Sequence, residues 1–104
     1  MSDCIFCKIV GGLLPSKTVW SNEKFIAFWD IHPKAKVHIL VIPKHHIPSF
    51  NDFTNDDQVW LGEYMIAIKS AAESLGLTHY QVRFHNGAAS GQEIFHLHAH
   101  ILQN

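Results

Sequence analysis

Apolar residues are concentrated in three short runs in the first half of the chain. Residues 17–20 and 25–31 are rich in β-prone side chains, and Ser21-Asn22-Glu23 between them is suited to a turn, so the pattern predicts a hairpin. A third strand is predicted over 37–42, where Pro43 ends it. Within that strand His38 shares a face with two apolar residues, because successive side chains point to opposite faces.

A helical pattern follows in the middle of the chain. Thr54 is a candidate N-cap, and acidic residues occupy the first turn after it. Gly76 is well placed to end the helix. Between these two residues, apolar side chains recur in steps of four and three, and we expect them to form the buried face: Leu61, Met65, Ile68, Ala72 and Leu75.

Two more strands are predicted after the helix. Residues 80–85 form one, the small-residue loop 86–91 follows, and 95–102 form the other. Strands therefore cluster before and after one long helix and do not alternate with helices. This order predicts one α+β domain over 1–104 with an antiparallel sheet of about five strands.

The last predicted strand carries His96, His98 and His100 in strict alternation with apolar residues. In an extended strand the three imidazoles would line one face, with same-face neighbours roughly 6.7 Å apart and the outer pair roughly 13 Å apart. A zinc–nitrogen bond is only about 2.1 Å long, so one ion would not bind all three rings. A solvated polar face is the bland alternative, but imidazole is well suited to proton transfer and to attack on phosphorus. We therefore expect the three rings to divide their work along the strand.

Composition and charge exclude some classes of function. The formal charge is -1, from 8 basic and 9 acidic residues, and no basic stripe is present, so binding in a nucleic-acid groove is not expected. Hydrophobic residues make up 47% of the 104, which is more apolar surface than one small core readily hides, and a homodimer would cover the excess.

The beginning of the chain carries an acid, Asp3, where a secretory signal has basic residues, and no apolar run approaches membrane-spanning length. We therefore expect a cytoplasmic protein without a membrane partner. Cys4 and Cys7 would then be free thiols or metal ligands and not a structural disulfide.

Four segments together carry a resemblance to a known family. They are Gly91-Gln92-x-x-x-His96-x-His98-x-His100, Cys4-Ile5-Phe6-Cys7-Lys8-Ile9, Phe28-x-Asp30-Ile31, and His38-x-Leu40-Val41-Ile42-Pro43-Lys44-x-His46-Ile47. In this order they resemble the histidine triad (HIT) family, and the chain looks closest to its short Hint-type branch. The resemblance implies a HIT-like α+β fold with an antiparallel sheet of about five strands, one long helix and a short N-terminal helix.

The same resemblance implies a hydrolase that acts on the α-phosphate of purine nucleoside phosphoramidates. His98 matches the histidine that attacks phosphorus and forms a covalent nucleotidyl intermediate. His100 matches the phosphate partner, and His38 matches a histidine that orients the proton network. The backbone around Gly91 and the amide of Gln92 are expected to contact the phosphate.

The remaining nucleotide contacts are also implied by the resemblance. Asp30 matches the ribose-binding acid, and Phe28 and Ile31 are expected to flank the base or sugar, although a turn acid and core packing are the plain alternatives. Glu93 and His85 stand where related chains often carry a hydroxyl residue and an asparagine, so we include both among the nucleotide-binding residues. Both departures bear on which leaving group is accepted.

The paired cysteines suggest a metal site. Cys4-x-x-Cys7 has zinc-ligand spacing, and related proteins complete such a site with two histidines, which correspond to His46 and His96. His45 is an alternative to His46, and unmetallated thiols are an alternative to zinc. The zinc would be structural, and we expect no organic cofactor and no catalytic metal.

Three other functions stay open. Dinucleoside polyphosphate hydrolysis would use the same chemistry on a different leaving group. A nucleotide-binding scaffold would make catalysis incidental, and a metal-dependent hydrolase would place an ion at the histidines.

Overall fold

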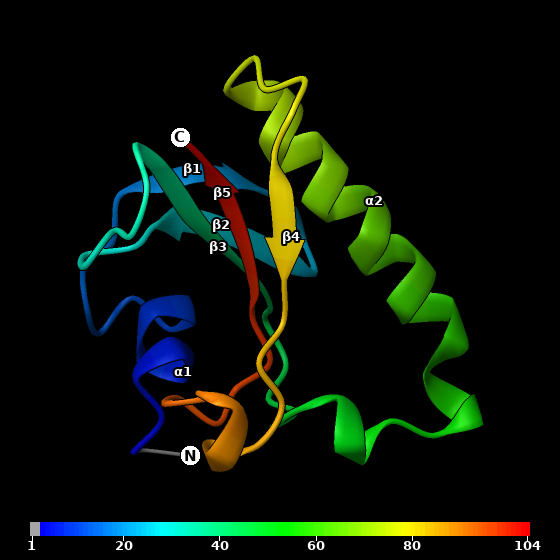
Figure 1. Ribbon diagram of the computed structural model, residues 1–104. Helices are drawn as coiled ribbons and strands as arrows, with labels where there is room; N and C mark the ends of the chain where they lie inside the picture. The colour runs from blue at the N-terminus through cyan, green and yellow to red at the C-terminus, as the bar shows by residue number, and fades with distance from the viewer. Residues whose placement is uncertain (1–2) are drawn as a thin grey trace.

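The computed structural model describes residues 3–104 and contains one five-stranded antiparallel sheet, confirming the predicted fold class. Its strands lie side by side in the order β1-β2-β3-β5-β4, so the last strand of the chain sits next to the centre (Figure 1). The bounds are β1 Thr18–Ser21, β2 Phe25–Trp29, β3 Val37–Pro43, β4 Gln81–Arg83 and β5 Ala99–Gln103.

The central pairing of β3 with β5 sets which side chains share a face. Leu40 is the register partner of His100, and Val41 is the partner of Ala99. Because side chains alternate along both strands, the sheet acquires two different faces. One face carries the apolar set Phe25, Ala27, Ile39, Val41, Ala99 and Ile101, and the other carries Phe28, His38, Leu40, Ile42 and His100.

The long helix α2, Gln58–Ser74, covers the first face (Figure 1). Two short 3₁₀ turns, Phe50–Asp52 and Asn55–Asp57, lead into it. Thr54 caps the second of these turns in a capping box with Asp57, so the cap begins one turn earlier than α2 itself. The predicted end is confirmed, because the backbone turns at Gly76 with a φ of 72°.

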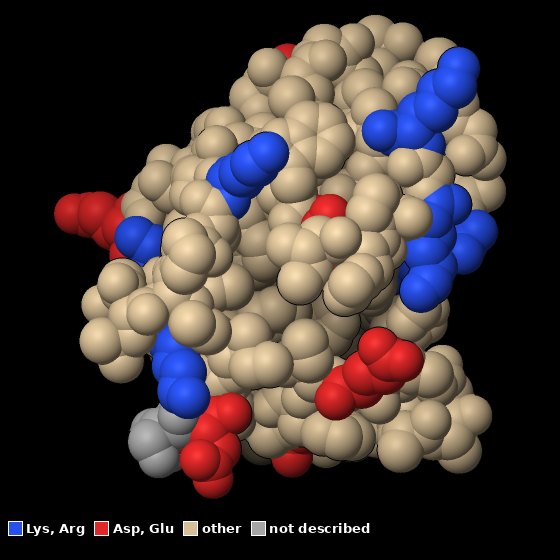
Figure 2. Space-filling view, turned by 90° about the vertical axis from the view of Figure 1, so that its left-hand side faces the viewer, with Lys and Arg blue, Asp and Glu red and all other residues tan. Residues whose placement is uncertain are grey.

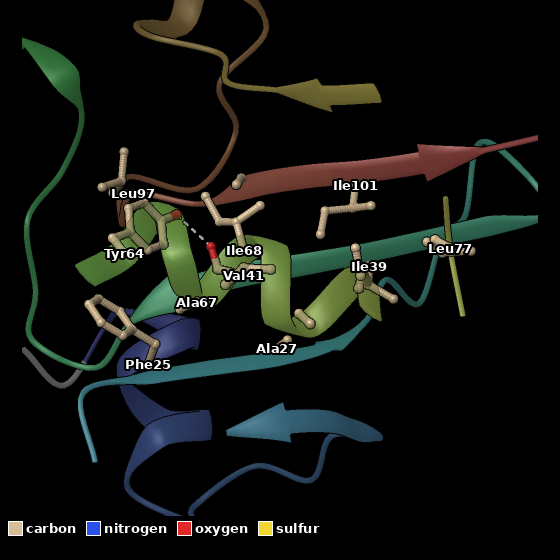
Figure 3. Close-up of a cluster of buried hydrophobic side chains, with 13 residues drawn as sticks. Phe25, Ala27, Ile39, Val41, Tyr64, Ala67, Ile68, Leu77, Leu97 and Ile101 are labelled. Atoms are coloured by element: carbon tan, nitrogen blue, oxygen red, sulfur yellow. Dashed lines mark hydrogen bonds between the residues drawn. The ribbon is translucent and has the colours of Figure 1, made fainter. Parts of the chain in front are cut away.

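The buried side of α2 centres on Tyr64. Its ring stacks on Phe25 at 5.3 Å between centroids, and its hydroxyl donates a 2.6 Å hydrogen bond to the Val41 carbonyl (Figure 3). Ala67 and Ala71 are also buried, and their small side chains let the helix lie close to the sheet.

This packing corrects part of the expected helix face. Ile68 and Ala72 are buried as predicted, whereas Met65 is 46% exposed. Tyr64 takes the central place because its hydroxyl finds a backbone partner in the sheet, and this turns the neighbouring Met65 outward. The spacing of hydrophobic residues alone does not predict that a tyrosine is buried in the core.

A short helix α1, Ile5–Val10, lies against the opposite face of the sheet, confirming the expected N-terminal helix. The Cys4 sulfur accepts a hydrogen bond from the Cys7 amide at 3.3 Å and so caps this helix. Phe6 is buried, and it packs with Phe28, Leu40 and Ile42 in a second, smaller apolar cluster.

The histidine segment departs from the predicted strand. Strand β5 begins only at Ala99, so His96 and His98 precede it. Continued, the register would place His98 opposite Ile42 and then Leu97 opposite Pro43, which has no amide hydrogen to donate, and the ladder ends at Ala99. The Leu97 amide bonds instead to the Ile47 carbonyl at 2.7 Å.

Two other strands are shorter than predicted. The expected strand over 25–31 ends at Trp29, which leaves Asp30 and Ile31 in the following turn. The expected strand over 80–85 is reduced to β4, and His85 lies beyond its end. Within residues 3–104, no helix combines the length and apolar character that crossing a bilayer requires.

We predict that Tyr64→Phe lowers the free energy of unfolding by about 1 kcal/mol, since it removes the buried hydroxyl that bonds to the Val41 carbonyl. Chemical denaturation followed by circular dichroism measures the change. Ile66→Ala is the matched control, because Ile66 of α2 is 64% exposed, and it should change stability by less than about 0.5 kcal/mol. Equal effects of the two substitutions would contradict the packing described here.

Candidate functional site

The histidines gather on the face of the sheet opposite α2, which we call the histidine face: His38, His96, His98 and His100. Phe6 of α1 closes this face, with its ring 5.2 Å from that of His98 and 5.8 Å from that of His96. The His98 and His100 rings are 4.9 Å apart, closer than same-face neighbours of a regular strand. His96 and His98 are both buried, so their hydrogen-bond partners determine what each ring can do.

The His98 ring has one nitrogen held and one free. Its Nδ1 lies 2.7 Å from the His96 carbonyl oxygen, which can only accept, so Nδ1 carries the proton and donates. Burial lowers the pKa of His98, which keeps the ring neutral. Its Nε2 therefore presents a lone pair, as a nucleophile requires.

His38 and His100 form a directed chain of hydrogen bonds. The Lys34 amide donates to His38 Nδ1 at 3.0 Å, so the proton of the neutral His38 ring lies on Nε2. That nitrogen lies 2.9 Å from His100 Nδ1 and donates to it. The proton of the neutral His100 ring is then on Nε2, which is buried and has no partner among residues 3–104.

A buried donor without a partner points to a ligand, because leaving it unsatisfied costs free energy. Burial, together with the neighbouring rings of His98, His38 and His85, lowers the pKa of His100 to about 4. The ring is therefore neutral before a ligand arrives and offers an N–H donor. Of the ligands that such a donor would bind, a phosphate oxygen carries the charge that strengthens the hydrogen bond most.

Asp30 stands beside this pair, just after β2. One carboxylate oxygen accepts from the His32 amide at 2.8 Å, and the other lies 3.4 Å from His38 Nε2. Ile31 is 85% exposed next to it, and Phe28 is buried against Phe6 in an edge-to-face contact at 5.6 Å. A carboxylate beside apolar and aromatic side chains is an arrangement that can take a sugar hydroxyl and a flat ring together.

The loop before the histidine segment is a braced turn. Gly87 and Gly91 both have positive φ, at 89° and 98°, around the 3₁₀ turn Ala88–Ser90. The amides of residues 90–92 all bond within the loop, to the carbonyls of Gly87 and Ala88. Gly91 thus provides the turn, and its own amide is engaged and not free for an anion.

Gln92 has a different task from the one expected. Its side-chain amide donates to the Pro48 and Ile94 carbonyls at 2.8 and 3.0 Å, and its oxygen accepts from the Gly87 amide at 2.9 Å. Both amide hydrogens are engaged, which corrects the predicted contact of this amide with phosphate. Gln92 instead joins the loop to the chain beyond β3.

His85 and Glu93 flank the loop. The His85 ring lies 4.8 Å from that of His100, and a Cβ on Gly91 would come within 3.9 Å of it, so His85 packs between the loop and the histidine face. Glu93 is exposed. It lines a hollow of about 410 Å³ together with Asp3, Cys4, Ile5, His46, Ile94 and Phe95.

The four predicted metal ligands meet at the other end of the histidine face and form the cysteine-histidine cluster, Cys4, Cys7, His46 and His96. All four ligand atoms lie within 4.8 Å of one another. The Cys4 sulfur is 3.3 Å from His96 Nδ1, and the Cys7 sulfur is 3.4 Å from His46 Nδ1. In a tetrahedral zinc site with bonds of about 2.1 and 2.3 Å, sulfur and nitrogen ligands lie about 3.6 Å apart, so the cluster can hold such an ion.

The hydrogen bonds and packing of the histidines determine which nitrogen atoms are available as metal ligands. His96 Nε2 donates to the Pro43 carbonyl at 2.8 Å, which leaves the Nδ1 lone pair directed at the sulfurs. Burial lowers the pKa of His96 to about 4, so that lone pair is not protonated. His45 is excluded as the fourth ligand, because its ring packs on Trp60 at 4.5 Å between centroids.

Three features of the site were not predicted from the sequence. Phe6 lies between the histidines and Phe28, and its place in the segment Cys4-Ile5-Phe6-Cys7 was the available signal. The Lys34 amide and the Pro43 carbonyl orient two of the rings, and backbone partners of this kind leave no trace in residue identity.

The charged side chains do not form a large basic surface on the face shown in Figure 2. On the face drawn in Figure 2, basic groups are separated from one another by uncharged surface and form no continuous stripe. This agrees with the small formal charge of -1.

Comparisons with known proteins agree with this geometry. Residues 3–104 match the family described as "Scavenger mRNA decapping enzyme C-term binding". The protein HitA of Neisseria gonorrhoeae is 39% identical over 103 residues, which cover 98% of this chain and 96% of that protein.

Solved structures are also similar. A HIT family hydrolase from Clostridium thermocellum superposes with a TM-score of 0.94 at 38% identity, covering 100% of this chain and 92% of that one. A histidine triad nucleotide-binding protein from Candida albicans superposes with a TM-score of 0.82 at 32% identity, covering 95% and 73%.

The hydrogen bonds predict the tautomer of each ring. We expect long-range ¹H–¹⁵N NMR at pH 7 to find the proton of His98 on Nδ1, and those of His38, His96 and His100 on Nε2. The exposed His79 serves as an internal reference for a ring in exchange with solvent. A proton on Nε2 of His98 would contradict the nucleophile assignment, because the lone pair would then face the His96 carbonyl.

Proposed function

The chain belongs to the histidine triad family, and we propose that it hydrolyses purine nucleoside phosphoramidates through a covalent nucleotidyl intermediate on His98. The observation that carries this proposal is the pairing of a free lone pair on His98 with an unpartnered N–H on His100, on rings 4.9 Å apart. A nucleophile beside a donor for a phosphate oxygen is what displacement at phosphorus needs. The resemblance to structures named as hydrolases and as a nucleotide-binding protein supports the same reading.

The proposed reaction has two displacements. His98 Nε2 bonds to the α-phosphorus while the bond from phosphorus to the amine breaks, and the amine leaves with a proton taken from solvent. Water then attacks the phosphorus and gives up a proton to solvent, the bond to Nε2 breaks, and the lone pair returns to His98. The Nδ1–H bond to the His96 carbonyl stabilises the positive charge that the ring carries while nucleotidylated.

Nucleotide binding is divided among the surrounding residues. Asp30 accepts from the ribose hydroxyls, and Phe28 and Ile31 flank the base or sugar. His100 donates to a phosphate oxygen, with His38 behind it as the ring that fixes its tautomer. His85, Gly91, Gln92 and Glu93 border the phosphate, and Gln92 acts there through the loop that it braces.

Charge favours phosphoramidates over dinucleoside polyphosphates, the second candidate substrates. Glu93 is exposed at the phosphate loop, and Asp3 lines the same hollow. Two carboxylates repel an anionic nucleotide as leaving group and tolerate a neutral or cationic amine.

A nucleotide-binding scaffold with incidental catalysis is the third candidate function, and loss of turnover without loss of the cellular role would favour it.

We further propose that the cysteine-histidine cluster holds a structural zinc ion. Two thiolates and two imidazoles suit zinc, which would tie the N-terminal segment to β3 and to the histidine segment. Cys4 also caps α1, so the metal and the helix cap would support each other. The proposal needs no organic cofactor and no catalytic metal.

The assembly we propose is a homodimer in the cytoplasm, as in the short Hint-type branch. Strand β4 is an edge of the sheet and its Val82 is 43% exposed. An apolar hollow of about 390 Å³ adjoins it, lined by Phe50, Phe53, Leu61, Gly62, Tyr64, Met65 and Phe84. A second copy of the chain would cover both features.

The covalent step predicts the behaviour of His98→Ala. With adenosine 5′-phosphoramidate, we expect turnover to fall at least about 1,000-fold, since the nucleophile is removed. Rapid-quench mass spectrometry should find an adenylyl adduct on His98 of the unsubstituted protein. His79→Ala, an exposed histidine outside the site, is the matched control and should react normally. If the unsubstituted protein gives neither product nor adduct, the proposed reaction is wrong for this substrate.

The metal proposal predicts different results for two adjacent histidines. We expect the protein and His45→Asn to bind one equivalent of zinc, while His46→Asn binds it at least about 10-fold more weakly, because only His46 faces the sulfurs. Zinc content after competition with a chelator measures the difference, and thermal unfolding should follow it. Equal zinc affinity in the two variants would contradict the four-ligand assignment.

A further inference from the structure

A second group of metal-ligating side chains lies in the part of the histidine face assigned to nucleotide, and we call it the aspartate-histidine cluster: Asp30, His38 and His100. One ligand atom from each lies within 4.8 Å of the other two. Asp30 Oδ2 is 3.4 Å from His38 Nε2, which is 2.9 Å from His100 Nδ1. A carboxylate and two imidazoles are suitable donors for zinc and related transition metals.

The atoms outside the cluster already hold each ligand in the orientation that an ion needs. The Lys34 amide occupies His38 Nδ1, so Nε2 is the nitrogen left to face the cluster. The His32 amide occupies one oxygen of Asp30, so the other is left free. His100 presents the Nδ1 lone pair inward, with its proton on the opposite nitrogen. Such outer hydrogen bonds fix ligand orientation and tautomer in metal sites.

The proton of the His38–His100 hydrogen bond occupies the position that a metal ion would take. The His38–His100 hydrogen bond places a single hydrogen between two nitrogens that would otherwise both present lone pairs. We propose that Zn²⁺ binds at the aspartate-histidine cluster in place of this proton and thereby excludes the nucleotide. The His38 Nε2 proton passes to solvent, both nitrogens and the carboxylate bond to the ion, and no oxidation or reduction takes place.

The distances require only a small adjustment. Ligands about 2.1 Å from a tetrahedral ion lie about 3.4 Å apart, which the Asp30–His38 distance of 3.4 Å already matches. The His38–His100 pair must widen from 2.9 Å by about half an ångström, which small ring movements supply. The Asp30 side chain is 19% exposed and gives an ion its route from solvent.

Inhibition follows from the residues that the ion would occupy, and this step rests on the proposed function. Asp30 would no longer be free for the ribose hydroxyls, whereas a metal on His100 Nδ1 would leave the Nε2–H of that ring in place, so the exclusion acts through the ribose contact. His98 stays outside the cluster, because it is not among the residues whose ligand atoms meet there. The ion would therefore compete with nucleotide for binding and leave the nucleophile unligated.

The two clusters differ in strength. The cysteine-histidine cluster offers four ligands, two of them thiolates, whereas the aspartate-histidine cluster offers three nitrogen and oxygen ligands. Softer and more numerous ligands bind zinc more tightly, so the first cluster fills before the second. Activity would then fall only when free zinc exceeds what the structural site removes.

Cobalt is a suitable probe for the second site. The protein is first saturated with one equivalent of zinc, freed of excess metal, and then titrated with Co²⁺ while the visible spectrum and calorimetry are recorded. We expect one further equivalent to bind with a nitrogen and oxygen spectrum that lacks thiolate bands. Asp30→Asn should weaken this binding at least about 10-fold, since it removes one of three ligands but keeps the contact to the His32 amide. Asp56→Asn, an exposed acid at the start of the α2 region, is the matched control and should leave it unchanged.

Competition with AMP tests the exclusion. We expect the apparent dissociation constant of Co²⁺ to rise in proportion to AMP concentration. The apparent dissociation constant of AMP should rise in the same way with Co²⁺ concentration. Asp30→Asn protein that binds the second ion as tightly as the unsubstituted protein would overturn the site. Metal and AMP bound together without mutual weakening would overturn the exclusion. Both measurements are independent of turnover, so a failure of phosphoramidate hydrolysis with AMP-sensitive metal binding would count against the proposed reaction alone.

Discussion

The pairing of β3 with β5 is the constraint on which the rest of the molecule depends. Register partners Val41–Ala99 and Leu40–His100 decide at once which side chains lie under α2 and which form the histidine face. A slip of one residue would turn every side chain of β5 to the opposite face. It would bury His100 under the helix and expose Ile101. The hydrophobic core and the functional site are therefore two results of the same register, and neither can change without the other.

Pro43 ends this pairing and gives the site its shape. Because proline donates no hydrogen bond, the histidine segment leaves the ladder before Ala99, and the Pro43 carbonyl is left to accept from His96. A regular strand would space its same-face rings evenly. Released from the strand, His96 instead reaches the cysteines while His98 stays within 4.9 Å of His100. One missing backbone donor thus separates the cysteine-histidine cluster from the rings of His98 and His100.

The parts of this arrangement that follow from alternation could be predicted from the sequence. The face of each strand, the α+β order and the Cys4-x-x-Cys7 pair depend on spacing, which the sequence contains, whereas the two histidines grouped with the cysteines were implied by the family resemblance. The choice between His45 and His46 depends on how the chain turns after Pro43, and Trp60 settles it from a distant helix. The internal bonds of Gln92 and the outward turn of Met65 likewise depend on partners far away in sequence. Local pattern carries no information about such partners, so these features had to come from the structure.

The histidine face also shows how one type of side chain acquires several tasks. In each ring one nitrogen is hydrogen-bonded to a neighbour, and the other is left for a ligand or substrate. The partner is a backbone carbonyl for His98 and His96, a backbone amide for His38, and the His38 ring for His100. Burial lowers the pKa of His96 and His100 to about 4, so closely packed rings remain neutral and do not repel one another. A neutral ring can offer either a lone pair or an N–H, whereas a protonated ring offers only N–H. Desolvation therefore preserves the difference between ligand, nucleophile and donor that the backbone imposes, and the same fold can place a cation at one end of the face and a phosphate at the other.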